Sequence, residues 1–222
     1  MMTRNRSNKL NGDAPQNANV ETSDSKNGKA TKRTPTSKAS ESPSAKVSKK
    51  ASPQALDNPV IDAKSVYDFT MKDTFGKDVP LSKYKGKVLL IVNIASKCGY
   101  TKKNYDELNT LQEQYKNKDF QILSFPCNQF GSQMPQKDGE DMMCHLEKRN
   151  VKVGDVFQKI DVNGKNAAAL YTYLRQKQGD GANVKWNFVK FLVDKKGQPV
   201  ERLGSSTSPL QIVPKIDKLL AE

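Results

Sequence analysis

The sequence predicts an α/β domain with a central mixed sheet flanked by helices, a β-hairpin at its N-terminal edge and a basic tail in front. Two apolar runs, residues 88–95 and 120–125, have the length and composition of buried strands. A segment with helical spacing separates them, and the order strand, helix, strand is typical of a parallel pair. Hairpin patterns at residues 66–81, and at 188–193 with residue 199 onward, add antiparallel strands.

The first half of the domain is expected to hold a hairpin, the central strand and a long helix. Alternation with period two predicts the hairpin, and an unbroken apolar run predicts a strand covered on both faces. Apolar residues recur at helical spacing after that strand. The elements cover residues 66–73 with 79–81, 88–95, and 102–118. Cys98 therefore lies between the carboxyl end of the central strand and a helix.

The second half is expected to hold the parallel strand at 120–125, two helices, a second hairpin and a last helix. Gly197 supplies the left-handed residue of the second turn. Ser208 followed by Pro209 marks a helix start, and Pro214 is compatible with the last helix only if that helix begins late. Its inward face is predicted to carry Leu210, Val213, Ile216 and Leu220. The other predicted helices cover residues 138–149 and 167–176.

Composition divides the chain into a tail at residues 1–58 and a domain at 59–222. Apolar residues make up 35% of the chain, and the mean hydropathy is −0.76. The tail lacks aromatic residues and repeated apolar spacing, so it cannot offset its ordering entropy and is expected to be disordered. It has 11 Lys/Arg and 5 Asp/Glu, a net charge of 11 − 5 = +6, which leaves +7 of the total +13 for the domain.

The basic tail is interpreted first as a solvated spacer, with binding to an anionic surface or nuclear import through residues 46–50 as alternatives. No aromatic residues interleave with its charges, so no specific nucleic-acid binding is expected. The longest apolar run is too short to span a bilayer. Three widely spaced cysteines fit a reducing compartment and no metal site. We expect a cytoplasmic protein. Targeting by the basic tail to mitochondria or to the nucleus is the alternative for part of the protein.

Cys98 is the candidate nucleophile because it precedes a helix start. Backbone N–H donors and the positive end of the helix dipole favour the thiolate there, and the thiolate is the attacking species. Lys97, Lys102 and Lys103 act in the same direction where they approach the sulfur. From position alone, a buried packing cysteine is the alternative.

Three segments surround the candidate site. They are residues 93–101 (Asn-Ile-Ala-Ser-Lys-Cys-Gly-Tyr-Thr), 125–133 (Phe-Pro-Cys-Asn-Gln-Phe-Gly-Ser-Gln) and 185–193 (Lys-Trp-Asn-Phe-Val-Lys-Phe-Leu-Val). In this order and spacing they resemble the glutathione peroxidase family, and the resemblance extends from about residue 67 to the C-terminus. It implies a thioredoxin-like fold, reduction of hydroperoxides and a catalytic tetrad of Cys98, Gln133, Trp186 and Asn187.

The chemistry of this tetrad is consistent with peroxide reduction. The amides of Gln133 and Asn187 and the indole N–H of Trp186 are neutral donors, so they solvate a sulfur anion without burying another charge. The product on Cys98 would be a sulfenic acid. No bound cofactor is implied, and the reducing cosubstrate would be thioredoxin or glutathione.

Cys144 resembles the resolving cysteine of the insect-like, thioredoxin-dependent branch of the family. It would attack the sulfenic acid to form a Cys98–Cys144 disulfide, which thioredoxin would open by exchange. Two alternatives stay open: a glutathione-dependent peroxidase in which Cys144 is dispensable, and a peroxide sensor that passes a disulfide to a partner protein. A structural role beside Met142 and Met143 is the simpler alternative for Cys144.

Two other residues near the motifs are interpreted as structural. Cys127 follows a buried strand and is expected to be an inert packing thiol. His145 adjoins Cys144, but adjacent helical residues point apart, so a Cys–His pair is not expected. Residues 153–163 lack the assembly loop of tetrameric family members, which by resemblance implies an open-sited monomer that accepts phospholipid hydroperoxides as well as hydrogen peroxide. The basic domain surface is compatible with an anionic lipid surface.

Overall fold

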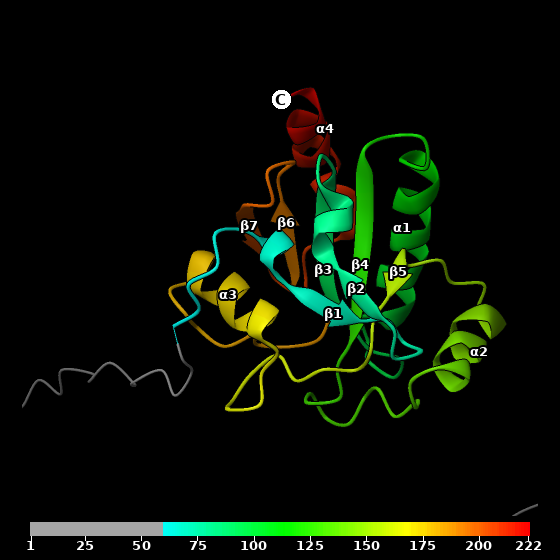
Figure 1. The fold of residues 1–222 in the computed structure, drawn as a ribbon. Helices are drawn as coiled ribbons and strands as arrows, with labels where there is room; N and C mark the ends of the chain where they lie inside the picture. The colour runs from blue at the N-terminus through cyan, green and yellow to red at the C-terminus, as the bar shows by residue number, and fades with distance from the viewer. Residues whose placement is uncertain (1–59) are drawn as a thin grey trace, which may run out of the picture. The chain divides into compact units, whose positions relative to one another are not determined.

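The structure, a computed structural model, describes residues 60–222, and within them a five-stranded mixed sheet forms the centre of the fold (Figure 1). Its strand order is β5-β4-β3-β6-β7. β3 pairs in parallel with β4 and antiparallel with β6. The strands are β3 (Val88–Ile94), β4 (Phe120–Pro126), β5 (Asp155–Val156), β6 (Lys190–Val193) and β7 (Pro199–Leu203).

β3 is the central strand, as its composition predicts. All seven of its residues are buried, because helices cover both faces of the sheet. Leu90 and Val92 face one side, while Leu89 and Ile91 face the other. The parallel pairing of β3 with β4 and the antiparallel β6–β7 hairpin, with Gly197 at φ +80° in its turn, confirm those two predictions.

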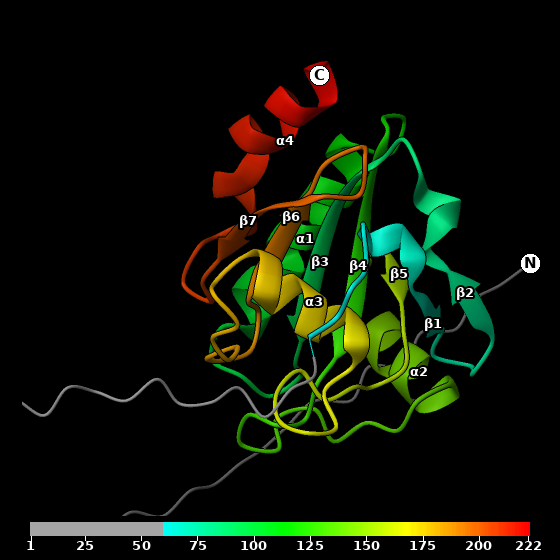
Figure 2. The same cartoon turned by 60° about the vertical axis from the view of Figure 1, so that its left-hand side comes forward.

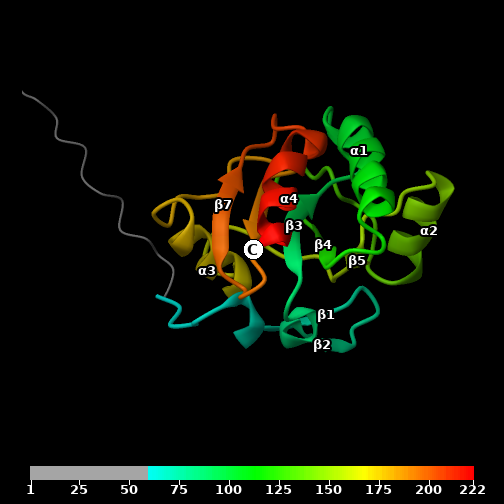
Figure 3. The same cartoon turned by 90° about the horizontal axis from the view of Figure 1, so that it is seen from above.

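Four α-helices within residues 60–222 complete the layers. Seen from above, α1 and α4 lie on one side of the sheet, and α3 lies on the other side with the β1–β2 hairpin (Figure 3). α2 packs at the edge of the α1 side through Met142 and Leu146. The helices are α1 (Thr101–Gln114), α2 (Glu140–Lys148), α3 (Ala169–Lys177) and α4 (Val213–Ala221).

The N-terminal hairpin is confirmed, as β1 (Thr70–Lys72) and β2 (Asp78–Pro80), but the first predicted strand is partly wrong. Val66–Asp68 forms a 3₁₀ helix instead, η1, and a second one, η2, follows at Leu81–Tyr84. The cause is local: the Ser65 hydroxyl accepts from the Tyr67 N–H, and Asp68 accepts from the Ser65 N–H. This capping box overrides the alternating pattern.

The ends of two helices also differ from prediction. α1 ends at Gln114 rather than near 118, because Tyr115 turns inward to pack on Phe120 with ring centroids 5.0 Å apart. The C-terminal segment begins as a 3₁₀ helix, η3 (Pro209–Ile212), and α4 begins late enough to accommodate Pro214 in its first turn. Its buried face is therefore Ile212, Ile216 and Leu219, and the prediction that Leu210 points inward is wrong: it is 38% exposed.

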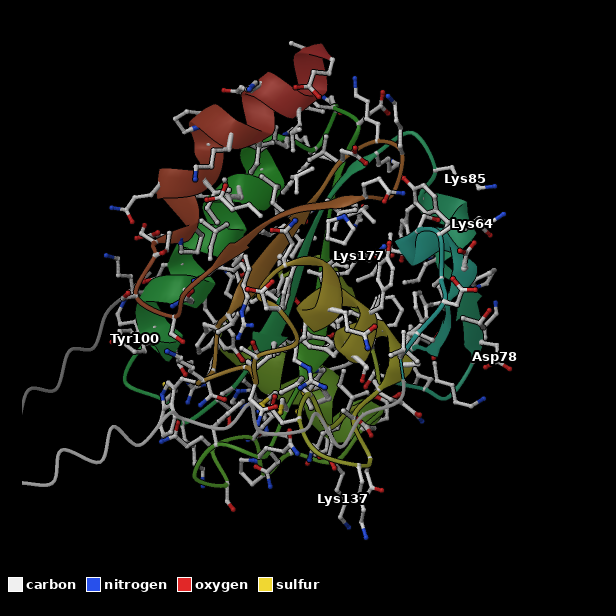
Figure 4. The ribbon with its side chains drawn as sticks, turned by 90° about the vertical axis from the view of Figure 1, so that its left-hand side faces the viewer. Lys64, Asp78, Lys85, Tyr100, Lys137 and Lys177 are labelled. Atoms are coloured by element: carbon white, nitrogen blue, oxygen red, sulfur yellow. The ribbon has the colours of Figure 1, made fainter. Side chains whose placement is uncertain are left out.

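The loops that matter for function gather at one end of the sheet. The loops after β3 and β4, the β5–α3 loop and the segment before β6 all lie at the lower end in Figures 1 and 2. Figure 4 shows Tyr100 and Lys137 toward this end, whereas Lys64 and Lys85 lie toward the opposite end. The predicted tail, residues 1–58 with its basic stretch at 46–50, lies outside the described residues.

Candidate active site

Cys98 lies in the loop between β3 and α1, and it is 9% exposed. Its main-chain N–H donates to Thr101 Oγ1 at 3.1 Å, and the Thr101 hydroxyl donates to the Ala95 carbonyl at 2.9 Å. The Tyr100 N–H donates to the thiol, with 3.5 Å between nitrogen and Sγ. The loop thus holds the sulfur beside the first turn of α1, with an N–H in place to stabilise negative charge on it.

Gln133 is tied to the Cys98 loop through its main chain. Its carbonyl accepts from the N–H groups of Ser96 and Lys97 at 2.9 and 3.0 Å, and from the Ser96 hydroxyl at 3.2 Å. These bonds join the loop after β4 to the loop after β3. Gln133 and Cys98 are far apart in the sequence, and these main-chain hydrogen bonds hold their two loops together.

Asn187 contacts Gln133 directly. Its side-chain Nδ2 donates to Gln133 Oε1 at 2.8 Å, and the whole residue is buried. Asn187 Oδ1 is buried and has no hydrogen-bond partner among the described residues. A buried amide oxygen without a partner is costly, and such exceptions concentrate at functional sites.

Trp186 borders the same site but is 38% exposed. Its ring packs on Phe130 with centroids 5.7 Å apart and an interplanar angle of 49°. Its main-chain carbonyl accepts from Asn93 Nδ2 at 3.1 Å, while Asn93 Oδ1 accepts from the Val189 N–H at 3.0 Å. Asn93 in β3 therefore fixes the segment that carries both Trp186 and Asn187.

The structure thus joins Gln133 to the Cys98 loop and to Asn187, with Trp186 beside them. Sequence reasoning missed Asn93 and Phe130 as supports of the site. The available signal for Asn93 was a polar residue within an otherwise apolar strand, where it must find partners.

Cys127 is inert in this arrangement. It is fully buried in the cluster on the α3 side of the sheet, whereas Cys98 belongs to the cluster on the α1 side. Burial raises the pKa of the Cys127 thiol to about 11. At neutral pH it is a protonated packing thiol.

Cys144 lies in the middle of α2 and is half-buried. Met142 and Leu146, two residues away on either side, point into the cluster that contains Cys98. Helical residues two apart do not share a face, so Cys144 faces away from that cluster. The structure therefore does not bring Cys144 against Cys98, and a disulfide between them requires α2 to loosen.

His145 does not serve a Cys–His pair, but it is expected to make α2 acid-sensitive. Its Nε2 is buried without a hydrogen-bond partner among the described residues, and burial with nearby Arg149 lowers its pKa from 6.5, against an opposing effect of Asp141. As the pH falls below about 6.5, the unfolded histidine binds a proton that the folded one does not, so stability is lost.

Hydrogen-exchange protection of α2 measured at pH 7.5 and 5.5 tests this expectation. Protection factors should fall in α2 on acidification and not in α3, and His145→Gln should reduce the fall. An equal loss of protection in wild type and His145→Gln would assign the effect to other groups.

Among residues 60–222, no group of three or more His, Cys, Asp or Glu side chains is arranged to hold a metal ion. In the same part of the chain, every helix is too short or too polar to cross a bilayer.

Similarity to known proteins identifies the family. The family model for glutathione peroxidase matches residues 66–175. A probable phospholipid hydroperoxide glutathione peroxidase from Mesembryanthemum crystallinum is 52% identical over 169 residues, which cover 75% of this chain and 96% of the relative. The Arabidopsis thaliana protein named probable glutathione peroxidase 3, mitochondrial, is 52% identical over 161 residues, 71% of this chain and 77% of the relative.

A solved structure of Trypanosoma cruzi GPX1 superposes with a TM-score of 0.58 at 39% identity, covering 71% of this chain and 97% of that one. Together with the structure of a thioredoxin family protein from Chlorobium tepidum, which is 14% identical with a TM-score of 0.50, it confirms the thioredoxin-like fold. The insect-like branch is not confirmed by these relatives and stays a prediction. At this level of identity and coverage, the chain belongs to the glutathione peroxidase family of thiol peroxidases.

Proposed function

We propose that this chain reduces hydrogen peroxide and phospholipid hydroperoxides through Cys98, with Gln133, Trp186 and Asn187 as donors, and that Cys144 and thioredoxin regenerate it. The proposal rests on the hydrogen bond between the side chains of Asn187 and Gln133. The main-chain carbonyl of Gln133 also accepts hydrogen bonds from the loop of Cys98, so the amide pair is attached to that loop. Neutral amide groups attached to the loop of a buried thiol fit stabilisation of a sulfur anion.

The first step is the attack of the Cys98 thiolate on the distal oxygen of the hydroperoxide. The S–O bond forms as the O–O bond breaks, and the leaving alkoxide or hydroxide takes a proton to become an alcohol or water. Cys98 is left as a sulfenic acid, oxidised by two electrons. The Tyr100 N–H, which already donates to Sγ, stabilises the negative charge of the thiolate before the attack.

The second step is the attack of the Cys144 thiolate on the sulfenic acid. An S–S bond forms, and the hydroxyl leaves as water after taking up a proton. Since Cys144 faces away from Cys98, α2 must open first. Met142 and Leu146 are the only fully buried side chains of this nine-residue helix, and Met143 packs half-buried against the same cluster. So few buried contacts are the property of a segment of low local stability.

Two alternatives differ in what happens after the first step. In a glutathione-dependent enzyme, a small thiol attacks the sulfenic acid of Cys98 directly, and the hydroxyl leaves as water. In a sensor, the oxidised cysteine passes its disulfide to a partner protein. Slow turnover together with a trapped mixed disulfide to a protein other than thioredoxin would favour the sensor.

NADPH-coupled turnover with each reductant tests the choice of reductant. We expect Cys144→Ser to lower thioredoxin-driven turnover by about tenfold or more, because the intramolecular attack of Cys144 is lost. The single-turnover oxidation of Cys98 should be unchanged, since Cys144 does not take part in it. Cys127→Ala is the matched control and should leave both rates intact.

The outcomes separate the alternatives. An unchanged thioredoxin-driven rate in Cys144→Ser would make Cys144 structural, and a glutathione-driven rate above the thioredoxin-driven rate would move the enzyme to the glutathione-dependent alternative. A loss of single-turnover oxidation in Cys144→Ser would contradict the division into two steps.

The substrate range follows from the openness of the site. Trp186 and Tyr100 are 38% and 42% exposed, and Lys97 and Lys185 lie exposed next to Cys98 and Trp186 in the sequence. An exposed aromatic edge with flanking cations fits a bulky acyl chain with an anionic headgroup. We infer a monomer that acts on phospholipid hydroperoxides at an anionic lipid surface.

The compartment stays a proposal. The cytoplasmic prediction is not confirmed, and the Arabidopsis relative is mitochondrial by name. That relative supports a mitochondrial pool beside the cytoplasmic one.

A further inference from the structure

Gln129, in the loop after β4, uses its side-chain amide to hold a distant loop. Its Oε1 accepts from the N–H groups of Val162 and Asn163 at 2.8 and 3.0 Å. Its Nε2 donates to the Asn163 carbonyl at 3.0 Å. Two of these three hydrogen bonds hold Asn163 itself and the third holds the residue before it, in the loop between β5 and α3.

The side-chain amide of Asn163 in turn holds the main chain of Val184. Its Nδ2 donates to the Val184 carbonyl at 2.8 Å, and its Oδ1 accepts from the Val184 N–H at 2.8 Å. A single amide therefore satisfies both main-chain groups of Val184, as a neighbouring strand would. Val184 is buried and stands two residues before Trp186.

The same loops meet again at the tryptophan. Phe130, next to Gln129, packs against the Trp186 ring. Three segments that are far apart in sequence therefore contact one another pairwise. They are the loop after β4, the β5–α3 loop and the segment before β6. These loops lie at one end of the fold in Figure 2.

We propose that Gln129 and Asn163 form a side-chain relay that positions Trp186 in the active site. They are positioning residues, because both act through Val184. The segment from residue 178 to 189 has no regular secondary structure, so Trp186 depends on such contacts for a fixed orientation. The catalytic consequence rests on the proposed role of Trp186, whereas the positioning itself does not.

Other contacts keep the segment folded when the relay is removed. Arg202 donates to the carbonyls of Ala182 and Asn183 at 2.8 and 2.6 Å, and Asn93 donates to that of Trp186. Loss of Asn163 therefore frees the middle of the segment while both sides stay attached. The expected effect is greater freedom of the Trp186 ring rather than unfolding.

Trp186 is the sole tryptophan of the chain, so fluorescence excited at a wavelength that tyrosine does not absorb reports on its environment alone. In Asn163→Ala we expect an acrylamide quenching constant about twofold higher than in wild type and a lower steady-state anisotropy. The rate constant for oxidation of Cys98 by hydrogen peroxide should fall about tenfold, since small misplacements of a catalytic group are costly. Thioredoxin KM should not change.

Matched variants separate positioning from general damage. Asn166→Ala, at an exposed position of the same loop, should match wild type in both measurements. Gln129→Ala should shift them in the same direction but less, because Gln129 is exposed and its hydrogen bonds compete with water. Asn163→Asp keeps the acceptor for the Val184 N–H and should recover part of the loss.

The two readouts also separate this inference from the proposed function. Unchanged quenching and anisotropy in both Asn163→Ala and Gln129→Ala would overturn the relay. If Asn163→Ala fails to fold, the same measurements on Asn163→Asp and Gln129→Ala decide. A wild-type oxidation rate in Trp186→Phe would instead refute the catalytic role of the tryptophan. The relay would then be tested by the quenching and anisotropy measurements alone.

Discussion

Replacing Asn187 with Asp is expected to slow the oxidation of Cys98 by peroxide on the order of 10²–10³-fold. The side chain is buried and donates to Gln133 Oε1 at 2.8 Å. A carboxylate has the same shape but no N–H, so two acceptors would face each other at this distance. It would also place a second negative charge near the sulfur anion, where burial weakens screening.

Stopped-flow single-turnover oxidation, followed by trapping of the sulfenic acid, measures this effect without the reductant. Asn166→Asp introduces the same chemical change at an exposed loop position and should leave the rate constant unchanged. Asn187→Ala should lose activity by a smaller factor than Asn187→Asp, because it removes the donor without adding a charge. A rate for Asn187→Asp within twofold of wild type would remove Asn187 from the set of donors.

Apolar patterns in the sequence are sufficient to predict the strands that have many buried residues. β3 and β4 are each seven residues long and almost wholly buried, so a continuous apolar run is their direct signature. β5 has two residues, too few for a periodic pattern, and it was not predicted. The 3₁₀ helix at Val66–Asp68 departs from the predicted strand because two side chains, Ser65 and Asp68, satisfy the backbone locally.

In the candidate site, too, some features can be predicted from the sequence and others cannot. The position of Cys98 before a helix can be predicted from the order strand, cysteine, helix. The bonds that join the loops of the site cannot, because they connect residues 36 to 96 positions apart, from the pair Lys97 with Gln133 to the pair Asn93 with Val189. Gln129 and Asn163 looked like ordinary polar loop residues, and only the fold reveals that their amides pair with backbone groups.

Gly154→Ala is expected to destabilise the domain by roughly 2–5 kcal/mol, the sum of a left-handed backbone strain and a steric overlap. Gly154 has φ +73°, and a Cβ there would lie 2.1 Å from the Ile122 carbonyl oxygen. That oxygen belongs to the backbone of β4 and cannot rotate away. The strain falls where β5 joins the sheet, beside the hydrogen bond of 2.7 Å from the Ser124 hydroxyl to the Val153 carbonyl.

Thermal unfolding measures this cost, with an expected Tm decrease of about 10 °C for a domain of this size. Gly86→Ala is the matched control: its φ is +84°, but a Cβ would meet nothing within 4 Å, so only the backbone strain of about 1–2 kcal/mol applies. The difference between the two variants isolates the contact with Ile122. Equal decreases in Tm would mean that β4 and β5 can separate at this point without cost. The closeness of the two strands would then contribute nothing to stability, and the position of β5 would depend on the β1–β2 hairpin, to which Asp73 and Phe157 connect it.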